Sequence, residues 1–180
     1  MLSKITSLSL IASASAAATQ YDAAGTCPDV PVVENFDKAS YTGRWYEIER
    51  SRTQPWEWFG DCCTATYGIL EDGNVSVANR GWFFWTLGYS TVNAFANFPK
   101  ADEGKCHVDF KDQAGEANYN VLMTDYETYT VVYDCSHNNT FGTKRESVWI
   151  MSRESTLPEE TIADLKAKTH EILPWYDFSK

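Results

Sequence analysis

The chain has 180 residues, enough for one domain with a full core, and its formal net charge at pH 7 is −10. Such acidity excludes a nucleic-acid binder and disfavours simple electrostatic docking on anionic lipid. Aromatic residues make up 14% of the chain and include 7 Trp, a high load that needs an interior or a binding surface to hold it.

We expect a secretory signal peptide over residues 1–18. Lys4 is the charged start, an apolar region follows over residues 5–12, and small residues then offer cleavage sites after Ala16 and after Ala18, which fit equally well. The apolar region is far shorter than the roughly 20 residues that a membrane span needs, so an anchor is the weaker interpretation. Only Lys4 is charged in this stretch, so its removal takes the net charge from −10 to −11.

Residues 19–180 are expected to form one domain, in which short alternating runs separated by turn signals predict strands. The clearest turn is the Glu-Asp-Gly-Asn sequence at 71–74, because Gly supplies a positive φ and Asp and Asn favour turns. Strands are expected over residues 44–50, 62–69, 75–83, 89–97, 105–110, 118–123, 129–135 and 147–152. This spacing indicates an all-β barrel or sandwich, with a short helical turn over residues 36–41 closing one end.

One helix is expected after the last strand. Thr156 and Glu159 fit a capping box, with Pro158 in the first turn, and Pro174 ends the helix. Mostly apolar residues recur at three- and four-residue steps: Ile162, Leu165, Thr169 and Ile172. This pattern predicts one helix face lying against the barrel wall.

Three separated motifs carry a family resemblance. Gly43 to Arg50 opens the first strand, Thr124-Asp125-Tyr126 lies between two strands, and Arg153 ends the last strand. In this order they resemble the three signatures of the lipocalin family. The flanks Cys27-Pro28 and Leu157-Pro158-x-Glu160-Thr161 are similar to its apolipoprotein D-like branch, which is near the bilin-binding and crustacyanin-type lipocalins. The resemblance covers roughly residues 27–173, and it implies an eight-stranded antiparallel up-and-down barrel with one C-terminal flanking helix.

The chain has 5 Cys, and an export signal with an odd count indicates disulfides and one remaining thiol. The resemblance implies a disulfide between Cys27 and Cys135. Cys62 also matches one cysteine of a second disulfide in that branch. The other cysteine of that disulfide, which follows the helix in the branch, has no counterpart in this sequence. Cys106 is then expected to replace that partner, for Cys62 or for Cys63, and the sequence leaves this choice open.

The motif residues are expected to hold the barrel shut rather than to contact a ligand. Gly43 permits a close approach that a side chain would block. Trp45 is placed inward at the base, where Arg153 can stack on its indole in a cation–π contact of about 1 kcal/mol or more. The resemblance gives the same structural role to the full set: Gly43, Trp45, Thr124, Asp125, Tyr126 and Arg153.

Eight strands enclose room for one small ligand. Strand alternation together with the resemblance predicts an aromatic cup with Asn79 as a polar orienting group, a usual composition for a small-molecule site. The expected ligand-binding residues are Tyr67, Asn79, Phe83, Phe95, Phe110 and Trp149. Plain core packing is the competing interpretation for each aromatic residue.

Other chemistry finds little support in the sequence. His107, His137 and His170 are isolated and no phosphate-binding loop occurs, so neither a metal nor a cofactor is expected. Cys63 shares the inward alternation of Tyr67 and is the one candidate nucleophile, as in lipocalin-type synthases. No Lys, Arg or His is adjacent to Cys63 in sequence to stabilise a thiolate.

Two loops at the open end of the barrel are rich in aromatic residues. They contain Trp56, Trp58 and Phe59 in one loop, and Phe84, Trp85 and Leu87 in the other. Such a rim indicates a membrane or protein contact, unless it folds inward as a lid. Two N-glycosylation sequons begin at Asn74 and Asn138, both in predicted turns.

The sequence therefore predicts a secreted, non-enzymatic carrier that binds one small hydrophobic ligand inside a barrel. A fatty acid, retinoid, carotenoid, bilin or steroid would each fit. The first alternative is an enzyme that acts on a lipid through Cys63. The second is a surface module whose aromatic rim binds a protein or a membrane.

Overall fold

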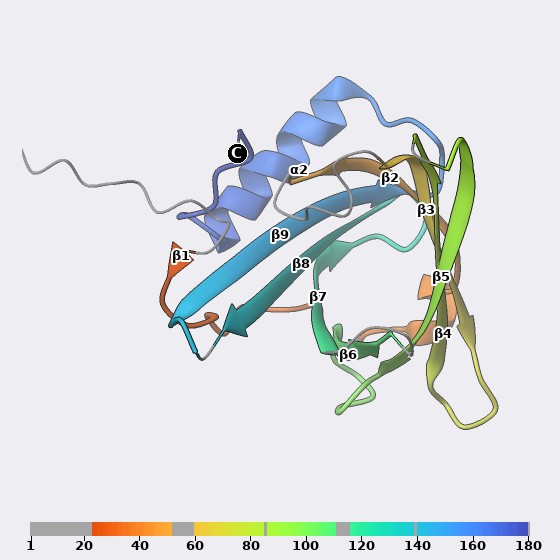
Figure 1. The fold of residues 1–180 in the computed structure, drawn as a ribbon, viewed down its shortest axis with the longest axis horizontal. Coiled ribbons are helices and arrows are strands. Elements are labelled where there is room, and N and C mark those ends of the chain that lie inside the picture. The colour runs from red at the N-terminus through yellow and green to blue at the C-terminus, as the bar shows by residue number, and fades with distance from the viewer. Residues whose placement is uncertain (1–22, 52–59, 85, 111–115, 139, 180) are drawn as a thin grey trace, which may run out of the picture.

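A computed structural model describes residues 23–51, 60–84, 86–110, 116–138 and 140–179. Within them nine strands form one antiparallel sheet, which closes because β9 pairs with both β8 and β2 (Figure 1). The strands are β1 (Ala23–Ala24), β2 (Gly43–Arg50), β3 (Gly60–Ile69), β4 (Val75–Phe83), β5 (Gly88–Asn97), β6 (Lys105–Asp109), β7 (Glu116–Thr124), β8 (Tyr129–Asn138) and β9 (Thr143–Ser152). Because β2 to β9 neighbour each other in chain order, the predicted eight-stranded up-and-down barrel is confirmed.

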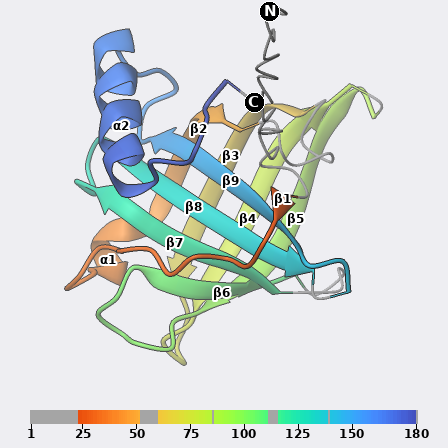
Figure 2. The same cartoon turned by 90° about the vertical axis from the view of Figure 1, so that its left-hand side faces the viewer.

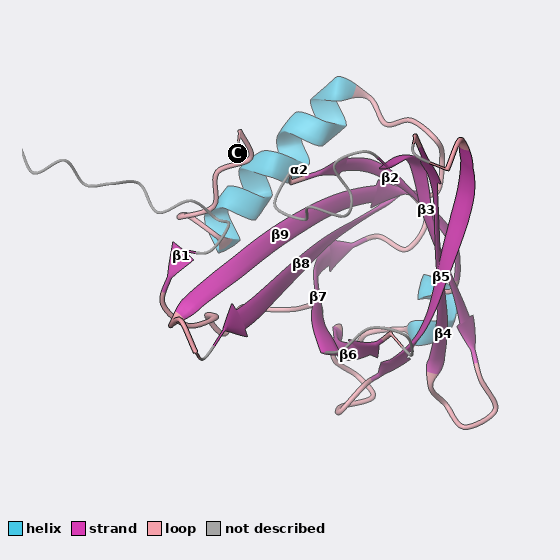
Figure 3. Ribbon diagram, viewed as in Figure 1, coloured by secondary structure: helices cyan, strands magenta, loops and turns pink. Residues whose placement is uncertain are grey.

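Two helices accompany the barrel, α1 (Lys38–Tyr41) and α2 (Glu159–Ile172). Figure 2 places α1 at one end of the barrel, and Figure 3 shows α2 lying outside it, alongside β9. The N-cap of α2 is Pro158, which makes no side-chain cap hydrogen bond, so the predicted capping box of Thr156 and Glu159 is wrong. Among the residues described, neither helix has the length and apolar character that a membrane crossing requires.

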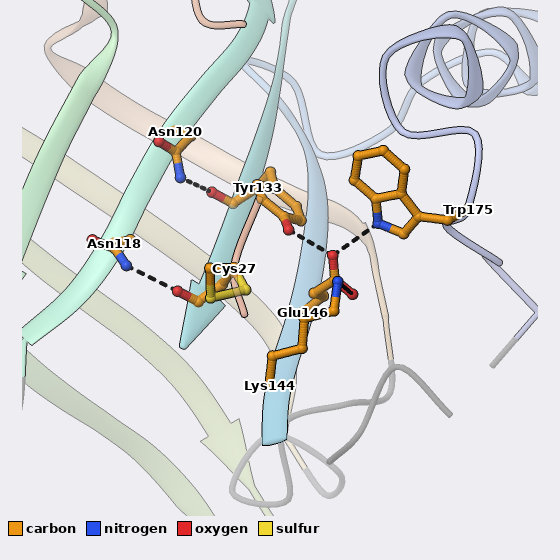
Figure 4. The surroundings of a disulfide bond; sticks show 8 residues. Cys27, Asn118, Asn120, Tyr133, Lys144, Glu146 and Trp175 are labelled. Atoms are coloured by element: carbon orange, nitrogen blue, oxygen red, sulfur yellow. Dashed lines mark hydrogen bonds and ion pairs between the residues drawn. A yellow bond between two sulfur atoms is a disulfide. The ribbon is translucent and has the colours of Figure 1, made fainter. Parts of the chain in front are cut away.

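β8 and β9 are longer than the sequence pattern indicates. β8 continues to Asn138, β9 begins at Thr143, and the two strands pair along their full length. Residues 144–146 are all charged, so a hydropathy pattern does not indicate a strand in this part of β9. In the structure Glu146 is only 2% exposed, on the outer side of the wall. Its burial is tolerated because hydrogen-bond and ion-pair donors surround its carboxylate. Figure 4 shows these donors: Lys144, Tyr133 and Trp175.

The barrel wall separates two apolar layers. Inward side chains of the strands fill one layer inside the barrel, and the other layer lies between the wall and α2. Side chains of β9 alternate between the two layers: Trp149 and Met151 belong to the inner layer, and Val148 and Ile150 belong to the outer one. Leu165 of α2 is 1% exposed and belongs to the outer layer, so the predicted apolar helix face does lie against the wall.

Arg153 and Trp45 meet at the base of the barrel. The guanidinium carbon of Arg153 lies 3.7 Å from the centroid of the fully buried Trp45 ring. The same guanidinium donates to three backbone carbonyl oxygens at 2.8–3.0 Å, those of Ser40, Arg44 and Tyr126. Gly43 has a φ of +96°, and a Cβ there would lie 3.3 Å from Arg153 Nη1. One side chain thus ties α1, the start of β2 and the turn before β8 together, and only glycine fits beside it without strain.

The turn between β7 and β8 presents one of those carbonyl groups. Asp125 Oδ1 accepts hydrogen bonds from the backbone amides of Glu127, Thr128 and Tyr129 at 2.7–3.1 Å. These bonds hold Tyr126 at a φ of +67°, a conformation that non-glycine residues rarely adopt. The Thr124-Asp125-Tyr126 motif therefore builds a rigid turn whose backbone meets Arg153.

The segment before α1, residues 23–37, is called the leader here, and it is held at more points than the Cys27–Cys135 disulfide that the resemblance implies. The Cys27–Cys135 disulfide is present and links the leader to β8 (Figure 4). In addition, β1 pairs with the start of β9, and the Val33 amide donates to the Val121 carbonyl oxygen at 2.9 Å. The signal peptide predicted over residues 1–18 lies outside the described residues.

Replacing Arg153 with Ala is expected to lower the free energy of unfolding by about 1–3 kcal/mol, because the stack on Trp45 and three hydrogen bonds are lost. Arg44→Ala is the matched control, since the Arg44 side chain is exposed next to the same site. Denaturant titration of both variants measures the difference. A large loss of ligand affinity for Arg153→Ala at unchanged stability would place this residue in the binding site instead.

Candidate functional site

The barrel encloses a cavity of about 410 Å³ whose wall takes side chains from each of the strands β2 to β9. Pockets for small molecules typically measure roughly 300–1,000 Å³. Much of the wall is apolar, with members such as Val75, Val77, Val108, Val132 and Met151. The interior is therefore a cavity large enough for a small ligand rather than a filled core.

Five of the six expected ligand-binding side chains are on this wall: Tyr67, Asn79, Phe83, Phe110 and Trp149. Phe95 is not, because the alternation along β5 is shifted by one residue from the one we expected. Phe95 pairs with Ser76, whose neighbours Val75 and Val77 face the cavity. On β5 the small residues Ala94 and Ala96 belong to the inner layer, so Phe95 lies on the other face of the strand.

Three tyrosines form the floor of the cavity. Tyr119 Oη lies 2.8 Å from Tyr41 Oη and 2.9 Å from Tyr67 Oη, and Tyr41 also meets Thr130 Oγ1 at 3.1 Å. Burial raises the pKa of all three tyrosines above the usual value, so their hydroxyl groups stay neutral. Alternation along the predicted 118–123 strand could have identified Tyr119, whereas Tyr41 comes from α1 and gives no such signal.

Glu47, Arg50 and Cys63 form a polar cluster on β2 and β3. Arg50 Nη1 donates to the Glu47 carboxylate and lies 3.6 Å from Cys63 Sγ. Simple alternation would put Glu47 and Arg50 on opposite faces, but a bulge in β2 directs both inward, opposite Met151 and Trp149. Burial raises the pKa of Glu47, while the Arg50 charge acts in the opposite sense. The fold thus gives Cys63 the neighbouring cation that its sequence neighbours lack.

Asp134 of β8 is a buried carboxylate on the cavity wall that the sequence did not single out. Its side chain is 6% exposed, and its Oδ1 has no hydrogen-bond partner among the residues that the structure describes. Burial raises the pKa of Asp134 to about 7, although a backbone hydrogen bond from Asn118 and the charge of Arg145 lower it. Nothing in the local sequence distinguishes this residue from a solvated aspartate.

Cys106 does not take the disulfide role expected for it. It is a free thiol, 3% exposed, on β6, whereas Cys63 lies on β3 with β4 and β5 between them. This separation around the wall explains why the two sulfur atoms do not pair. Burial raises the pKa of Cys106 to about 12, so its thiol stays protonated and inert at neutral pH. The Cys62 side chain lies outside the described part of the structure.

The remaining expectations concern the surface. In the described ranges, no group of three or more His, Cys, Asp or Glu could hold a metal ion. Asn74 lies in the turn before β4, Asn138 ends β8, and both sequons stay predictions. In the rim, Phe84 and Leu87 are 67% and 76% exposed. Its other expected members lie outside the described residues: Trp56, Trp58, Phe59 and Trp85.

Asp134→Asn is expected to raise the free energy of unfolding at pH 8 by about 1–3 kcal/mol. The pKa of Asp134 in the folded protein, about 7, exceeds its ordinary 3.8, so the folded state binds the proton more tightly. The resulting stabilisation of the wild type is complete below about pH 4 and is lost as pH rises through about 7. The advantage of the variant should therefore shrink between pH 8 and pH 5.

Urea unfolding at both pH values measures this change. Asp109→Asn is the matched control, because Asp109 is exposed on β6 and its removal changes the net charge equally. A stability difference between Asp134→Asn and wild type that is the same at pH 5 and pH 8 would contradict the raised pKa.

Comparison with known proteins agrees with this geometry. The lipocalin-like domain family matches residues 36–179. Apolipoprotein D of Rattus norvegicus is 38% identical over 146 residues, which cover 79% of this chain and 74% of that protein. The Lazarillo protein of Schistocerca americana is 29% identical over 138 residues, covering 76% of this chain and 64% of that protein.

Solved structures show the same barrel. Insecticyanin from the tobacco hornworm Manduca sexta superposes with a TM-score of 0.75 at 25% identity, covering 89% of this chain and 86% of that one. Lobster apocrustacyanin A1 has a TM-score of 0.63 at 20% identity, with 82% and 87% covered, and is similar in fold. The family match spans most of the chain and the apolipoprotein D relative is 38% identical over the 146 aligned residues, so this chain belongs to the lipocalin family.

Proposed function

We propose that this protein is a secreted carrier that holds one small hydrophobic molecule inside its barrel. The observation that carries the proposal is the cavity of about 410 Å³, with its largely apolar wall and a few polar groups. Lipocalins bind small hydrophobic ligands, and membership of that family supports the same function. The proposed contacts are the side chains on the wall: Tyr67, Asn79, Phe83, Phe110 and Trp149.

The expected affinity follows from the apolar surface that a ligand would bury. Burial of about 300 Å² at about 25 cal/mol per Å² contributes some 7 kcal/mol before entropic costs. Micromolar binding or better is therefore expected for an apolar molecule that fits the cavity. The hydroxyl groups on the floor bond one another, so an apolar end can rest there without displacing water from an unsatisfied polar group.

Export is part of the proposal. The pattern of residues 1–18 favours secretion, and the Cys27–Cys135 disulfide suits an oxidising compartment. The sequons at Asn74 and Asn138 are proposed as acceptors in that compartment. The rim residues Phe84 and Leu87 are proposed to contact the membrane or protein that delivers the ligand, because both are largely exposed.

The carrier function predicts that Trp149 matters more than the rim. Retinol serves as the probe, and quenching of tryptophan fluorescence reports its binding. Trp149→Ala should weaken retinol binding by about 1–3 kcal/mol through lost apolar contact, while Trp82→Ala on the outer face of β4 should not. If a Phe84→Ala, Leu87→Ala double variant abolished binding while Trp149→Ala did nothing, the ligand would sit on the rim and the surface-module function would replace the carrier.

A second candidate function is a lipid-modifying enzyme, and Arg50 is the observation that favours it. Its Nη1 lies 3.6 Å from Cys63 Sγ and could stabilise a thiolate, although the same guanidinium is already paired with Glu47. As a carrier, the protein should release retinol and lipid probes chemically unchanged, and Cys63→Ser should bind retinol with wild-type affinity within about threefold. Chromatography of the recovered probes tests this. A turnover that Cys63→Ser abolishes would establish the enzyme instead.

A further inference from the structure

The most exposed apolar side chains of the barrel lie in two turns between strands. Leu87 and Phe141 are each 76% exposed and Phe84 is 67% exposed, more than any other large apolar residue that the structure describes. Phe84 and Leu87 lie in the turn between β4 and β5, and Phe141 lies in the turn between β8 and β9. We call these two turns the hairpin tips. The sequence analysis identified the apolar residues of the first tip but not Phe141.

The two hairpin tips stand on opposite sides of the cavity mouth. Successive connections of an up-and-down barrel alternate between its two ends, so both tips lie at the same end, away from α1 (Figure 2). Around the closed sheet, β5 to β8 separate the tips on one side, and β9, β2, β3 and β4 separate them on the other. A flat surface can therefore touch both tips at once while the mouth faces it. The other two connections at this end include residues 52–59 and 111–115, which lie outside the described residues.

The backbone at Leu87 is costly for a leucine. Its φ is +47°, in the left-handed region that Gly and Asn adopt far more readily. Packing does not offset this cost, because the side chain is 76% exposed. Contact with something outside the chain therefore explains a leucine at this position better than folding does.

Aromatic residues with polar groups flank the β4–β5 tip, followed by a cation. Trp82 and Tyr89 are the second cross-strand pair from the turn, and the Arg80 guanidinium carbon lies 3.8 Å from the Tyr89 ring centroid. The side chains thus run from apolar residues at the tip, through Trp and Tyr, to Arg. At a membrane surface apolar groups enter the acyl chains, Trp and Tyr prefer the headgroup level, and Arg reaches the phosphates. The order along the hairpin matches this profile.

Both tips are free of acidic residues. The chain has 25 Asp and Glu, yet residues 73–101 and 135–145 contain none, and both stretches contain Arg and Lys. An anionic bilayer would repel the acidic remainder of the chain, whereas an electrically neutral bilayer would not. The charge distribution therefore favours a zwitterionic lipid surface at this end of the barrel.

We propose that the two hairpin tips dock the mouth of the barrel on a zwitterionic lipid surface, with Phe84, Leu87 and Phe141 inserted into it. The inference rests on the carrier function proposed above, and it assigns lipid rather than protein as the partner of the open end. A protein partner typically buries one continuous patch, whereas here two separated apolar points stand around a cavity. In the docked position the cavity opens towards the bilayer, so an apolar ligand enters it without crossing water.

Flotation with vesicles of pure phosphatidylcholine tests this docking. The proteins are produced in a bacterial periplasm, where disulfides form and no N-glycan is added beside the β8–β9 tip. Wild type should float with the vesicles. A Phe84→Gln, Leu87→Asn double variant should lower the bound fraction about tenfold, and so should Phe141→Gln, because each removes apolar contact with lipid. Ile69→Gln is the matched control and should float like wild type, because Ile69 is 51% exposed where β3 ends, at the opposite end of the barrel.

Leu87→Asn alone separates docking from stability. Because Asn adopts a φ of +47° more readily than Leu, this variant should resist urea as well as wild type or better. Its bound fraction should nevertheless fall, since one apolar contact with the lipid is lost. A lower bound fraction at undiminished stability cannot be attributed to unfolding.

Retinol binding in solution, measured by tryptophan quenching, keeps failure of the docking distinct from failure of the carrier function. None of Phe84, Leu87 and Phe141 lines the cavity, so the tip variants should keep the wild-type affinity for retinol. A wild type that binds retinol but does not float with phosphatidylcholine, or floats only when phosphatidylserine is added, overturns the docking and leaves the carrier intact. Flotation that the tip variants keep, or that Ile69→Gln loses equally, also overturns it. A wild type that floats but binds no retinol overturns the carrier instead.

Discussion

The barrel depends on the contact between the Arg153 guanidinium and the Trp45 indole at its base. Stacked at 3.7 Å from the ring centroid, the guanidinium also bonds backbone carbonyl groups of α1, β2 and the turn before β8. These segments are far apart in sequence, and this contact brings them to one point. The base is closed because Trp45 is fully buried beneath the Arg153 guanidinium. The Thr124-Asp125-Tyr126 turn holds the Tyr126 carbonyl group in place for its hydrogen bond from Arg153. The cavity therefore has a floor at this end.

A closed floor gives the polar groups inside the barrel different roles. The floor tyrosines bond one another, and Glu47 is paired with Arg50, so these groups are satisfied without a ligand. Asp134 lies on the same wall with one buried oxygen that has no hydrogen-bond partner among the described residues. Satisfied polar groups hold a structure in one arrangement, whereas a buried unsatisfied one costs stability. The floor tyrosines and the Glu47–Arg50 pair therefore belong to the framework of the cavity.

The outer side of the wall stabilises the same barrel independently of the cavity. α2 packs on β8 and β9 through Leu165, and the C-terminal segment adds a hydrogen bond from Trp175 to buried Glu146 at 2.9 Å. The Cys27–Cys135 disulfide joins the leader to the same part of the wall (Figure 4). Because these contacts lie outside the barrel, the interior is left free of the packing that a small domain would otherwise need there. A cavity inside the barrel is compatible with a stable fold for this reason.

Alternation and turn residues are local properties, so the sequence by itself located eight of the strands and the late helix and indicated an all-β barrel or sandwich. The choice of a barrel and the closing motifs came from the resemblance to the lipocalin signatures. Alternation and the resemblance together identified most of the aromatic wall. Tertiary structure decided the rest. The bulge in β2 turned Arg50 towards Cys63, and the register of β4 against β5 turned Phe95 away from the cavity. Closure of the sheet kept Cys106 apart from Cys63, and it buried Asp134 with one oxygen that has no hydrogen-bond partner among the described residues. A one-residue shift moves every later side chain of a strand to the opposite face, so the sequence of a single strand does not reveal which face a side chain takes. Burial depends on which strands meet across the barrel, and a single strand does not reveal that either.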